Sequence, residues 1–427
     1  MQLGRYAKWM TEWETKLTTR DTNRIVRPLE WGFEWLKDFS DAHPSVQMEA
    51  PAQTTADAPS LDRMIALNRQ IVEHSDEFFG YQVPRDFRLE RRYPQLYPTN
   101  VRPETLAQDA EMKRQTANGE LGKAEFLRFT SPVRTPYPEN DQVNARWYPA
   151  PQRKGASAGG PKQAIIVLPQ WNSDALSHNV LCTLFNRFGI SALRLSQPYH
   201  DIRRPAELER SDYAVSSNIG RTTESCRQAV IDVRCCIDWL ETQGYTQFGV
   251  LGTSLGSCYA FIAAAYDPRL RVCAFNHAST WFGDVVWEGQ STRHVHAALQ
   301  RAGLTQDQVR QIFLGISPMS HMQRFAVHSK RVLVVHATYD LTFPLHLSLE
   351  ILNEFKQLKI DFVSKVLPCG HYTTGETPYK YIDGWYMGSF VYRAFKALRE
   401  EKAAGGNAAA VDSAPAHLEE EEEAVTH

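Results

Sequence analysis

The sequence of 427 residues contains no apolar run that approaches the roughly 20 residues a membrane-spanning helix needs. Residues 1–21 mix basic and acidic side chains and include no apolar stretch, so we expect neither a secretory signal nor a transit peptide there. Neither sign of charge dominates, because 47 Lys and Arg residues stand against 49 Asp and Glu residues. The net charge of -2 gives no electrostatic reason to expect a nucleic acid or an anionic membrane as partner.

Disulfide and metal-binding patterns are also missing. The 7 cysteines are an odd number, none forms a C-x-x-C pair, and several fall inside apolar periodic runs. Such thiols are typical of a reduced protein core, which favours a reducing compartment and predicts a cytoplasmic protein. His294-Val295-His296 is too short a pattern to hold a metal ion, so we expect neither a metal nor another cofactor.

Length and composition favour a globular protein with a sizeable core. Hydrophobic residues make up 43% of the chain, and its length suits one large domain with additions or two domains. We expect a helical N-terminal extension (residues 1–120), a domain of alternating strands and helices (121–402) and a disordered acidic tail (403–427). Within the middle domain, residues 279–328 interrupt the alternation and are expected to form a helical cap.

The alternating pattern predicts the fold class. The apolar run at 164–168 has the continuous hydrophobicity of a strand buried on both faces. Further strands are expected at 190–195, 248–251, 271–275, 331–336 and 362–367. Strands that alternate with helices imply right-handed crossovers, and therefore an α/β fold with a mostly parallel sheet flanked by helices.

The most specific motif is Gly252-Thr253-Ser254-Leu255-Gly256, which follows the strand at 248–251 and precedes a run of small residues that predicts a helix. A G-x-S-x-G sequence at such a turn is typical of a nucleophile elbow, where strained backbone lifts the serine hydroxyl clear of the sheet. Glycine at both ends avoids a Cβ where backbone segments pass closely. Ser254 is therefore the candidate nucleophile, and the alternative is an ordinary serine at a helix start.

A serine hydroxyl needs a base to take its proton, and the base needs a group that orients it. His371 lies after the last expected strand and is the candidate base. Asp340 lies after the strand at 331–336 and is the candidate orienting acid. The chain order Ser, Asp, His suits this arrangement of strands. The alternatives are that Asp340 is a turn residue before Pro344 and that His371 is a loop histidine.

Acyl transfer also needs two N–H donors for the oxygen that becomes charged. Leu255, the residue after the candidate nucleophile, is expected to supply one of them from its backbone. The loop after the strand at 164–168 is expected to supply the other, from Gln170 or Trp171, because Pro169 has no N–H.

The substrate pocket is expected between the carboxyl ends of the strands and the cap. His200 and His277 follow two of the strands, and Trp281 and Phe282 begin the cap, so these four are candidates for the pocket lining. The apolar lining that the cap offers through Trp281, Phe282 and Trp287 favours an acyl or aromatic group over a sugar. The two histidines, together with His336, are also rival candidates for the base, although none of them follows the last strand.

Over about residues 125–400 the chain resembles the α/β-hydrolase superfamily, through the G-x-S-x-G turn, the Asp340 and His371 loops and the cap-sized insertion. The resemblance implies a serine hydrolase in which Ser254, Asp340 and His371 form a catalytic triad. The loop that begins at Pro169 departs from the common pattern of the superfamily, because it lacks a His-Gly pair. This departure affects the assignment of the second N–H donor but not that of the triad.

A second likeness is to the proteins grouped as abhydrolase domain-containing 18. It rests on Leu195-Ser196-Gln197-Pro198-Tyr199-His200, on Arg203 and Arg204 nearby, and on the long helix before the elbow strand. The two arginines are interpreted either as an exposed loop pair or as groups that hold an acidic part of a substrate.

These patterns together predict a cytoplasmic serine hydrolase that cleaves a carboxylic ester through an acyl-enzyme intermediate. The substrate is expected to be a small-molecule or lipid ester, with no nucleic acid as partner. Thioesterases, lipid deacylases and peptidases share the fold and the triad, so these activities remain alternatives. The alternative from another class is a binding protein that kept the fold without catalysis.

Overall fold

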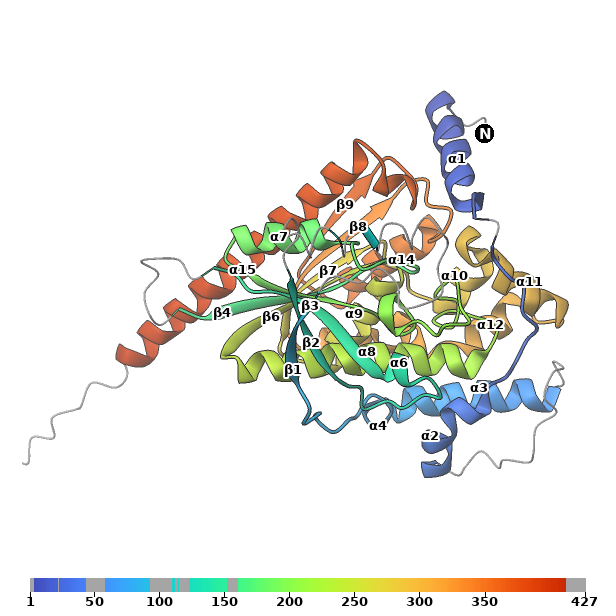
Figure 1. The fold of residues 1–427 in the computed structure, drawn as a ribbon. Helices are drawn as coiled ribbons and strands as arrows, with labels where there is room; N and C mark the ends of the chain where they lie inside the picture. The colour runs from blue at the N-terminus through green and yellow to red at the C-terminus, as the bar shows by residue number, and fades with distance from the viewer. Residues whose placement is uncertain are drawn as a thin grey trace, which may run out of the picture.

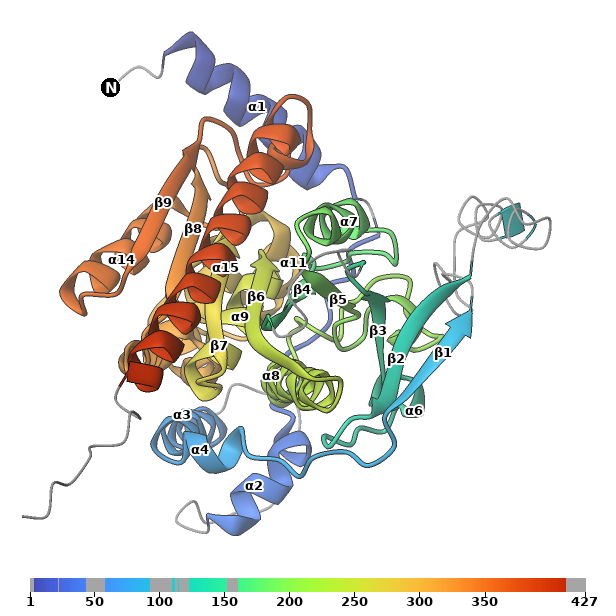
Figure 2. The same ribbon diagram turned by 90° about the vertical axis from the view of Figure 1, so that its left-hand side faces the viewer.

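The protein folds around one central sheet. A computed structural model describes residues 4–21, 23–43, 58–92, 110–111, 114, 123–151 and 160–411. Within these residues nine strands lie in the order β1-β2-β3-β5-β4-β6-β7-β8-β9, and helices cover both faces of the twisted sheet (Figures 1 and 2). The predicted fold class, an α/β fold with a mostly parallel sheet, is confirmed.

The sheet has an antiparallel part at one edge and a parallel part that makes up the rest. In chain order the strands are β1 (Arg88–Arg92), β2 (Ala124–Thr130), β3 (Gln142–Tyr148), β4 (Lys162–Leu168), β5 (Ser191–Leu195), β6 (Tyr245–Thr253), β7 (Leu270–Asn276), β8 (Arg331–Ala337) and β9 (Phe362–Leu367). The pairs β1-β2, β2-β3 and β3-β5 are antiparallel, and all other pairs are parallel. β1 falls inside the region expected to be helical, because its sequence Arg-Leu-Glu-Arg-Arg lacks the alternation that signals a strand.

Two layers of helices bury the two faces of the sheet. α7 (Asn179–Arg187) and α15 (Tyr379–Val411) share one apolar cluster with the strands. α8 (Ile219–Thr242), α9 (Leu255–Tyr266) and α14 (Leu345–Gln357) belong to the larger cluster on the other face. α15 continues past residue 402, where the acidic tail was expected to begin, and residues 412–427 lie outside the described residues.

Short helices fill the connection between β7 and β8, where the cap was expected. They are α10 (Phe282–Glu288), η3 (Gln290–Thr292), α11 (Arg293–Arg301), α12 (Gln306–Ile312), η4 (Leu314–Ile316), η5 (Pro318–His321) and α13 (Met322–Ala326). In Figure 1 the gold helices α10, α11 and α12 gather at one end of the sheet. Three other short helices are α6 (Pro138–Asp141), η2 (Asp201–Arg203) and η6 (Thr373–Gly375).

The N-terminal segment runs across the outside of the sheet domain and contacts it at distant points. Its helices are α1 (Arg5–Thr19), η1 (Phe33–Leu36), α2 (Lys37–Ala42), α3 (Ala58–Glu73) and α4 (Ser75–Phe78). At one end, the hydroxyl oxygens of Tyr6 and Tyr379 lie 2.7 Å apart, which ties α1 to the start of α15. At the other end, the Gly315 N–H donates to Asn68 Oδ1 over 3.1 Å, which ties α3 to the cap. The segment is therefore part of the fold rather than an appendage.

The cysteines lie in the interior, where their place in apolar periodic runs predicts them. All seven cysteines are free and buried, so none contributes a disulfide. Among the described residues, no helix combines the length and the apolar character that crossing a bilayer requires.

A close backbone crossing joins the N-terminal segment to the start of α8. The N–H groups of Ile219 and Gly220 donate to the carbonyl oxygens of Glu30 and Trp31, each over 3.0 Å. A Cβ built on Gly220 would lie 1.8 Å from the carbonyl oxygen of Gly32. Only glycine at position 220 permits the two backbones to approach this closely.

We therefore expect Gly220→Ala to lower the free energy of unfolding by about 3 kcal/mol, because the added methyl must push the two backbones apart. The matched control is Gly384→Ala in α15, where no atom lies within 4 Å of the new Cβ. Chemical denaturation of both variants checks this. Equal stability of the two would show that the crossing is not tightly packed.

Candidate active site

The turn at Ser254 places its hydroxyl at the edge of the sheet. β6 ends at Thr253 and α9 begins at Leu255, so Ser254 alone makes the turn. Its φ of 57° and ψ of -120° lie outside the regions that residues with a side chain favour. A Cβ on Gly252 would lie 2.1 Å from the carbonyl oxygen of Gly256, and a Cβ on Gly256 would lie 2.5 Å from backbone oxygens of the loop after β4. The two glycines thus permit the strained turn.

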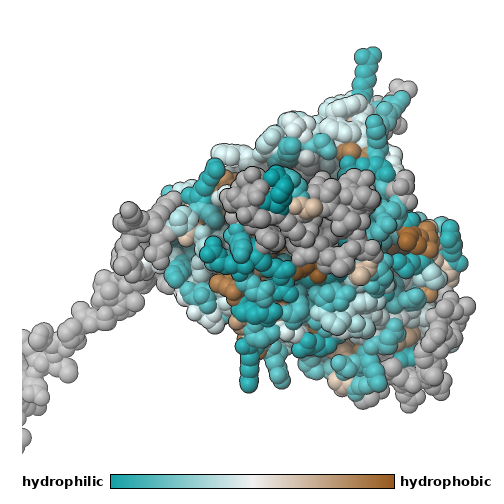
Figure 3. Space-filling model, viewed as in Figure 1, coloured by the Kyte–Doolittle hydropathy of each residue, from teal (hydrophilic) through white to brown (hydrophobic). Residues whose placement is uncertain are grey.

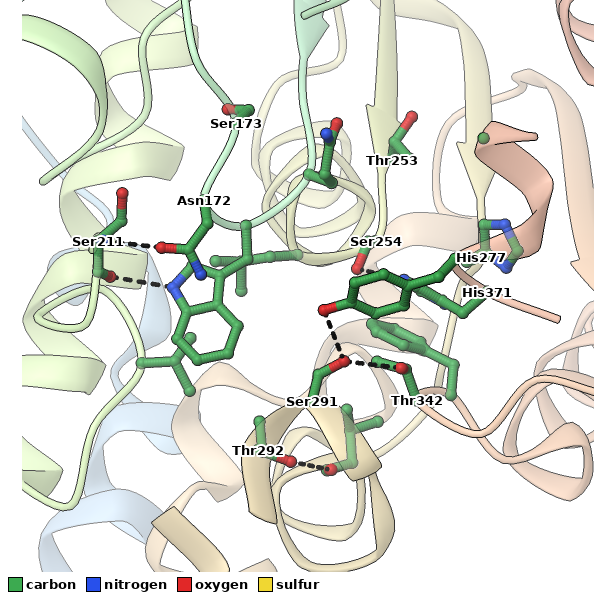
Figure 4. A pocket seen from close by; sticks show the side chains of 18 of the residues that line it. Asn172, Ser173, Ser211, Thr253, Ser254, His277, Ser291, Thr292, Thr342 and His371 are labelled. Atoms are coloured by element: carbon green, nitrogen blue, oxygen red, sulfur yellow. Dashed lines mark hydrogen bonds between the residues drawn. The ribbon is translucent and has the colours of Figure 1, made fainter. Parts of the chain in front are cut away.

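Ser254, His371 and Asp340 form a continuous chain of hydrogen bonds, of which Figure 4 shows the part between Ser254 and His371. His371 Nε2 lies 2.8 Å from Ser254 Oγ, and His371 Nδ1 lies 2.9 Å from Asp340 Oδ2. The other carboxylate oxygen, Oδ1, accepts the N–H groups of Thr342 and Phe343 over 2.8 and 2.6 Å. The Phe343 ring stacks on the His371 ring, with centroids 5.1 Å apart. The structure therefore brings together the three residues that the sequence singled out.

A second histidine shares the same carboxylate oxygen. His277 Nδ1 lies 2.9 Å from Asp340 Oδ2, and the backbone N–H of His277 donates to the Val335 carbonyl over 2.8 Å. The two imidazole rings lie 4.3 Å apart between centroids. His277 was considered as a pocket residue and as a rival base. It lines the cavity but contacts Asp340, whereas His371 is the ring within hydrogen-bond distance of Ser254.

The charges around these three residues favour an ionised Asp340 carboxyl and a basic His371 imidazole. Burial by itself works against the charged form of Asp340, but the two histidines and their hydrogen bonds hold the pKa of that carboxyl well below its usual range. Burial also works against a charged His371. The charge and hydrogen bond of Asp340, with the more distant charge of Glu14, outweigh it and raise the pKa of His371. Asp340 thus stays charged while His371 exchanges a proton.

The loop that carries His371 is held from outside the sheet by Glu14 of α1. Glu14 is fully buried, and its carboxylate accepts the N–H groups of Tyr372 and Thr373 over 2.8 and 2.9 Å. It also accepts the Thr373 hydroxyl over 3.0 Å. A Cβ on Gly370 would lie 2.4 Å from the Glu14 carboxyl carbon, so glycine makes room for this contact. The N-terminal segment therefore positions the loop of the candidate base.

The expected N–H donors border the same cavity as Ser254. Leu255, Gln170 and Trp171 all line it. The backbone N–H groups of these three residues have no hydrogen-bond partner within the described part of the chain. Leu255 is the first residue of α9, where backbone N–H groups have no partner inside the helix.

His200 holds the donor loop in place instead of lining the cavity. The Asn172 N–H donates to His200 Nε2 over 3.0 Å, and His200 Nδ1 donates to the Pro198 carbonyl over 2.8 Å. Burial lowers the pKa of His200 to about 3, so the ring stays neutral and its Nε2 remains an acceptor. The Trp171 indole N–H donates to the Ser211 carbonyl over 2.9 Å and fixes the same loop. Both ring nitrogens of His200 are engaged in these contacts. The expectation that His200 lines the cavity is therefore wrong.

The cavity in front of Ser254 has a volume of about 690 Å³. Its apolar wall comes from the cap, from α9 and from loops near them, and consists of Val215, Leu255, Cys258, Phe282, Val285, Val286, Pro318 and Phe343. Phe282 lies in the lining as expected, but Trp281 does not. The Trp281 indole N–H donates to Glu350 Oε1 over 3.3 Å, and Arg310 lies over its ring, so this side chain faces α14.

The arginine pair near His200 divides between core and cavity. Arg203 is fully buried and its Nη1 lies 2.9 Å from Asp232 Oδ2, so it is not an exposed loop residue. Arg204 lines the cavity, and its guanidinium donates to the Glu209 carbonyl over 2.7 Å.

Sequence reasoning missed several polar residues that line the cavity. His178 Nε2 lies 2.9 Å from Thr253 Oγ1, and the Asn276 amide donates to Asp383 Oδ2 over 2.9 Å. Burial raises the pKa of Asp383 to about 6, against the opposing effects of His277 and Asn276. Asp383 comes from α15, after the last strand, and no local pattern marks it. Only the packing of α15 against the sheet brings it here.

Two groups of three side chains in the described residues have the donor types of a metal site. One is His277, Asp340 and His371, where both histidine Nδ1 atoms already donate to the carboxylate. A cation there would displace both protons and break the contact of His371 with its acid. The other group is His43, His74 and Glu77 in the N-terminal segment, far along the chain from Ser254.

Comparison with solved structures identifies the fold. The acetyl xylan esterase 1 of Thermoanaerobacterium sp. JW/SL YS485 matches with a TM-score of 0.50 and 14% sequence identity, over 77% of this chain and 93% of the esterase. The chain has the α/β-hydrolase fold. An acetyl xylan esterase of Paenibacillus sp. R4 matches with a TM-score of 0.48 and 13% identity, over 77% of this chain and 92% of that one.

The acylaminoacyl peptidase of Pyrococcus horikoshii matches with a TM-score of 0.47 and 12% identity, over 64% of this chain but only 41% of the peptidase. No family model and no curated protein matches the sequence. The likeness to the abhydrolase domain-containing 18 proteins therefore stays a prediction.

The α/β-hydrolase fold explains how three distant residues meet. Ser254, Asp340 and His371 follow β6, β8 and β9, which are parallel and separated only by β7. Parallel strands end at one edge of the sheet, where open α/β folds gather functional groups. The loop after β4, the other neighbour of β6, brings the candidate N–H donors to the same edge.

The buried carboxylate of Glu14 has a measurable consequence. We expect Glu14→Gln to lower kcat/KM by roughly 10- to 100-fold, because the amide lacks one of the acceptors that hold the His371 loop. It also removes a negative charge that raises the pKa of His371. The base works in its neutral form, so activity is lost as pH falls through this pKa. A lower pKa therefore moves the acid limb of the pH–rate profile to lower pH.

The matched control is Glu12→Gln, an exposed carboxylate on the same helix. Its pH profile of kcat/KM for a soluble ester should match that of the unmodified protein. A Glu14→Gln profile that also matches would mean that α1 does not position the base.

Proposed function

We propose that this protein is a serine hydrolase that cleaves a carboxylic ester through an acyl-enzyme intermediate. The observation that carries the proposal is the chain of hydrogen bonds from Ser254 Oγ through His371 to Asp340, which opens on a cavity of about 690 Å³. A strained serine, a basic imidazole and a buried carboxylate in this order are the components that nucleophilic acyl transfer needs.

The geometry supports the following steps. Ser254 Oγ attacks the ester carbonyl carbon while His371 Nε2 takes the hydroxyl proton. The carbonyl oxygen becomes an oxyanion, which the N–H of Leu255 and that of Gln170 or Trp171 stabilise. When the C–O bond to the leaving alcohol breaks, the protonated His371 returns the proton to that oxygen. A water molecule then attacks the acyl carbon while His371 takes one of its protons, and the bond to Ser254 Oγ breaks as His371 returns the proton to that oxygen, which releases the acid.

Asp340 keeps His371 in the required tautomer. Its Oδ2 accepts the Nδ1 proton, so the lone pair of Nε2 faces the serine. Its ionised carboxylate also stabilises the imidazolium that forms during the attack. His277 donates to the same oxygen and thereby fixes the orientation of the carboxylate.

The cavity favours an ester with an apolar acyl or aromatic part. Its lining includes Val, Leu, Phe and Pro side chains that offer apolar contact, together with polar groups. We propose a small-molecule or lipid ester as substrate, and a cytoplasmic location on the strength of seven free buried thiols. Thioesters and peptide amides suit the same chemistry, and a panel of soluble substrates of the three classes distinguishes them.

Covalent labelling with a fluorophosphonate tests the proposal. We expect the protein to be labelled, and Ser254→Ala to lose both the label and at least about 10³-fold of its esterase activity. Ser291→Ala is the matched control, because Ser291 also lines the cavity but its hydroxyl contacts Thr342 and Tyr372 rather than a histidine.

Ser291→Ala should be labelled like the unmodified protein. If a correctly folded protein takes no label, a binding protein without catalysis is the better description. If Ser254→Ala is still labelled, another residue is the nucleophile.

A further inference from the structure

Large apolar side chains are exposed on three segments next to the cavity. Their exposed fractions lie between 43% and 86%. We call this group the rim patch, and its members are Tyr6 and Trp9 on α1, Leu176 just before α7, Val180 in its first turn, and Tyr381 and Trp385 on α15. A soluble surface usually disperses such residues, so their grouping is informative.

The three segments lie side by side. The Tyr6 hydroxyl contacts Tyr379 over 2.7 Å, and the Trp13 ring lies 6.5 Å from that of Tyr379, which joins α1 to α15. A Cβ on Gly388 would lie 2.9 Å from Leu184, which joins α15 to α7.

One further contact sets the register of α7 on α15. The rings of Phe188 and Tyr392 lie 5.1 Å apart, four residues further along both helices than the contact at Gly388. Continued one turn in the other direction, this register pairs the position of Val180 with that of Gly384, which precedes Trp385 in the chain. Figure 2 shows α7 and α15 next to each other on one face of the molecule.

Two segments of the rim patch stand beside cavity-lining residues in the chain. Ser177 and His178 line the cavity and stand between Leu176 and Val180 in the chain. Lys380 and Asp383 line it as well, and they stand next to Tyr381 and Trp385.

The third segment reaches the cavity only past its C-terminal end. Arg20 and Asp21, which follow α1, belong to the lining. Tyr6 and Trp9 lie at the other end of α1 from these two residues, so it is the α7 and α15 parts of the patch that adjoin cavity-lining residues in the chain.

Basic side chains accompany the apolar ones. The exposed charged residues on and directly after α1 are Arg5, Lys8, Lys16 and Arg20 against the single acid Glu12, and Lys380 is exposed at the start of α15. In Figure 3 hydrophilic side chains project at the upper right, where Figure 1 places α1. This local excess of positive charge is hidden in the overall net charge of -2.

We propose that the rim patch docks the protein on a lipid surface that carries anionic headgroups, with the cavity entrance facing the lipid. Trp and Tyr favour the boundary between water and hydrocarbon, because each has an apolar ring and a polar group. Lys and Arg extend toward the headgroups, and each adds roughly fivefold to binding at an anionic surface. An ester-bearing lipid then has a short path from the surface to Ser254. This last step rests on the proposed hydrolase function, whereas docking itself does not.

Vesicle binding by the full chain tests the proposal. Co-sedimentation compares vesicles of phosphatidylcholine alone with vesicles that also contain phosphatidylglycerol. We expect binding to the mixed vesicles that weakens with salt, and at least a tenfold lower partition coefficient for Tyr381→Ser/Trp385→Ser. Lys8→Glu/Lys16→Glu should lower binding to the mixed vesicles alone.

The matched control is Val327→Ser, which removes an apolar side chain that is 69% exposed and lies outside the rim patch. It should bind like the unmodified protein. Tyr381→Ser/Trp385→Ser should keep its activity toward a soluble short-chain ester, since neither residue touches the Ser254 site. Ser254→Ala should bind vesicles normally, which separates failure of docking from failure of catalysis.

Three results would overturn the proposal: absence of binding to both kinds of vesicle, equal binding by Tyr381→Ser/Trp385→Ser, or equal binding to both compositions at all salt concentrations. A dimer in sedimentation analysis that Tyr381→Ser/Trp385→Ser dissociates would assign the patch to a contact between two copies of this chain instead.

Discussion

The strained turn at Ser254 is the constraint on which the rest of the site depends. Its positive φ points the hydroxyl away from the sheet, and it persists because Gly252 and Gly256 let three backbone segments pass within contact distance of each other. The same close packing sets the loop after β4 beside the start of α9. The turn therefore fixes the positions of both the candidate nucleophile and its N–H donors. His371 and Asp340 must then be brought to the same point by other contacts.

His371, the candidate base, is positioned beside Ser254 by contacts with several other elements. Asp340 is held by two backbone N–H groups and shares one oxygen between His371 and His277. The loop of His371 is held by Glu14, a buried carboxylate from the opposite end of the chain. A helix that looks like an extension in the sequence is thus a support of the site, and its outer face supplies part of the rim patch.

The parts of the structure that depend on local pattern were predictable. The apolar runs at 164–168 and 248–251 predicted buried parallel strands, and the G-x-S-x-G turn predicted the position of Ser254. Contacts between distant segments were not predictable. In the sequence, Glu14 is one charge among several on a polar helix, Asp383 is an ordinary helix residue, and His200 suggests a pocket histidine. Their roles depend on partners that lie 358, 107 and 28 residues away, respectively. The excess of exposed positive charge on α1 likewise does not show in the net charge of the whole chain.

The most direct test of the account is a crystal structure of the protein after reaction with a phosphonate ester. The account predicts a covalent bond between phosphorus and Ser254 Oγ. It also predicts one phosphonyl oxygen within hydrogen-bond distance of the Leu255 N–H and of the N–H of Gln170 or Trp171, with His371 Nε2 beside the serine oxygen. Phosphorus bound to another residue, or a phosphonyl oxygen that faces away from these N–H groups, would contradict it.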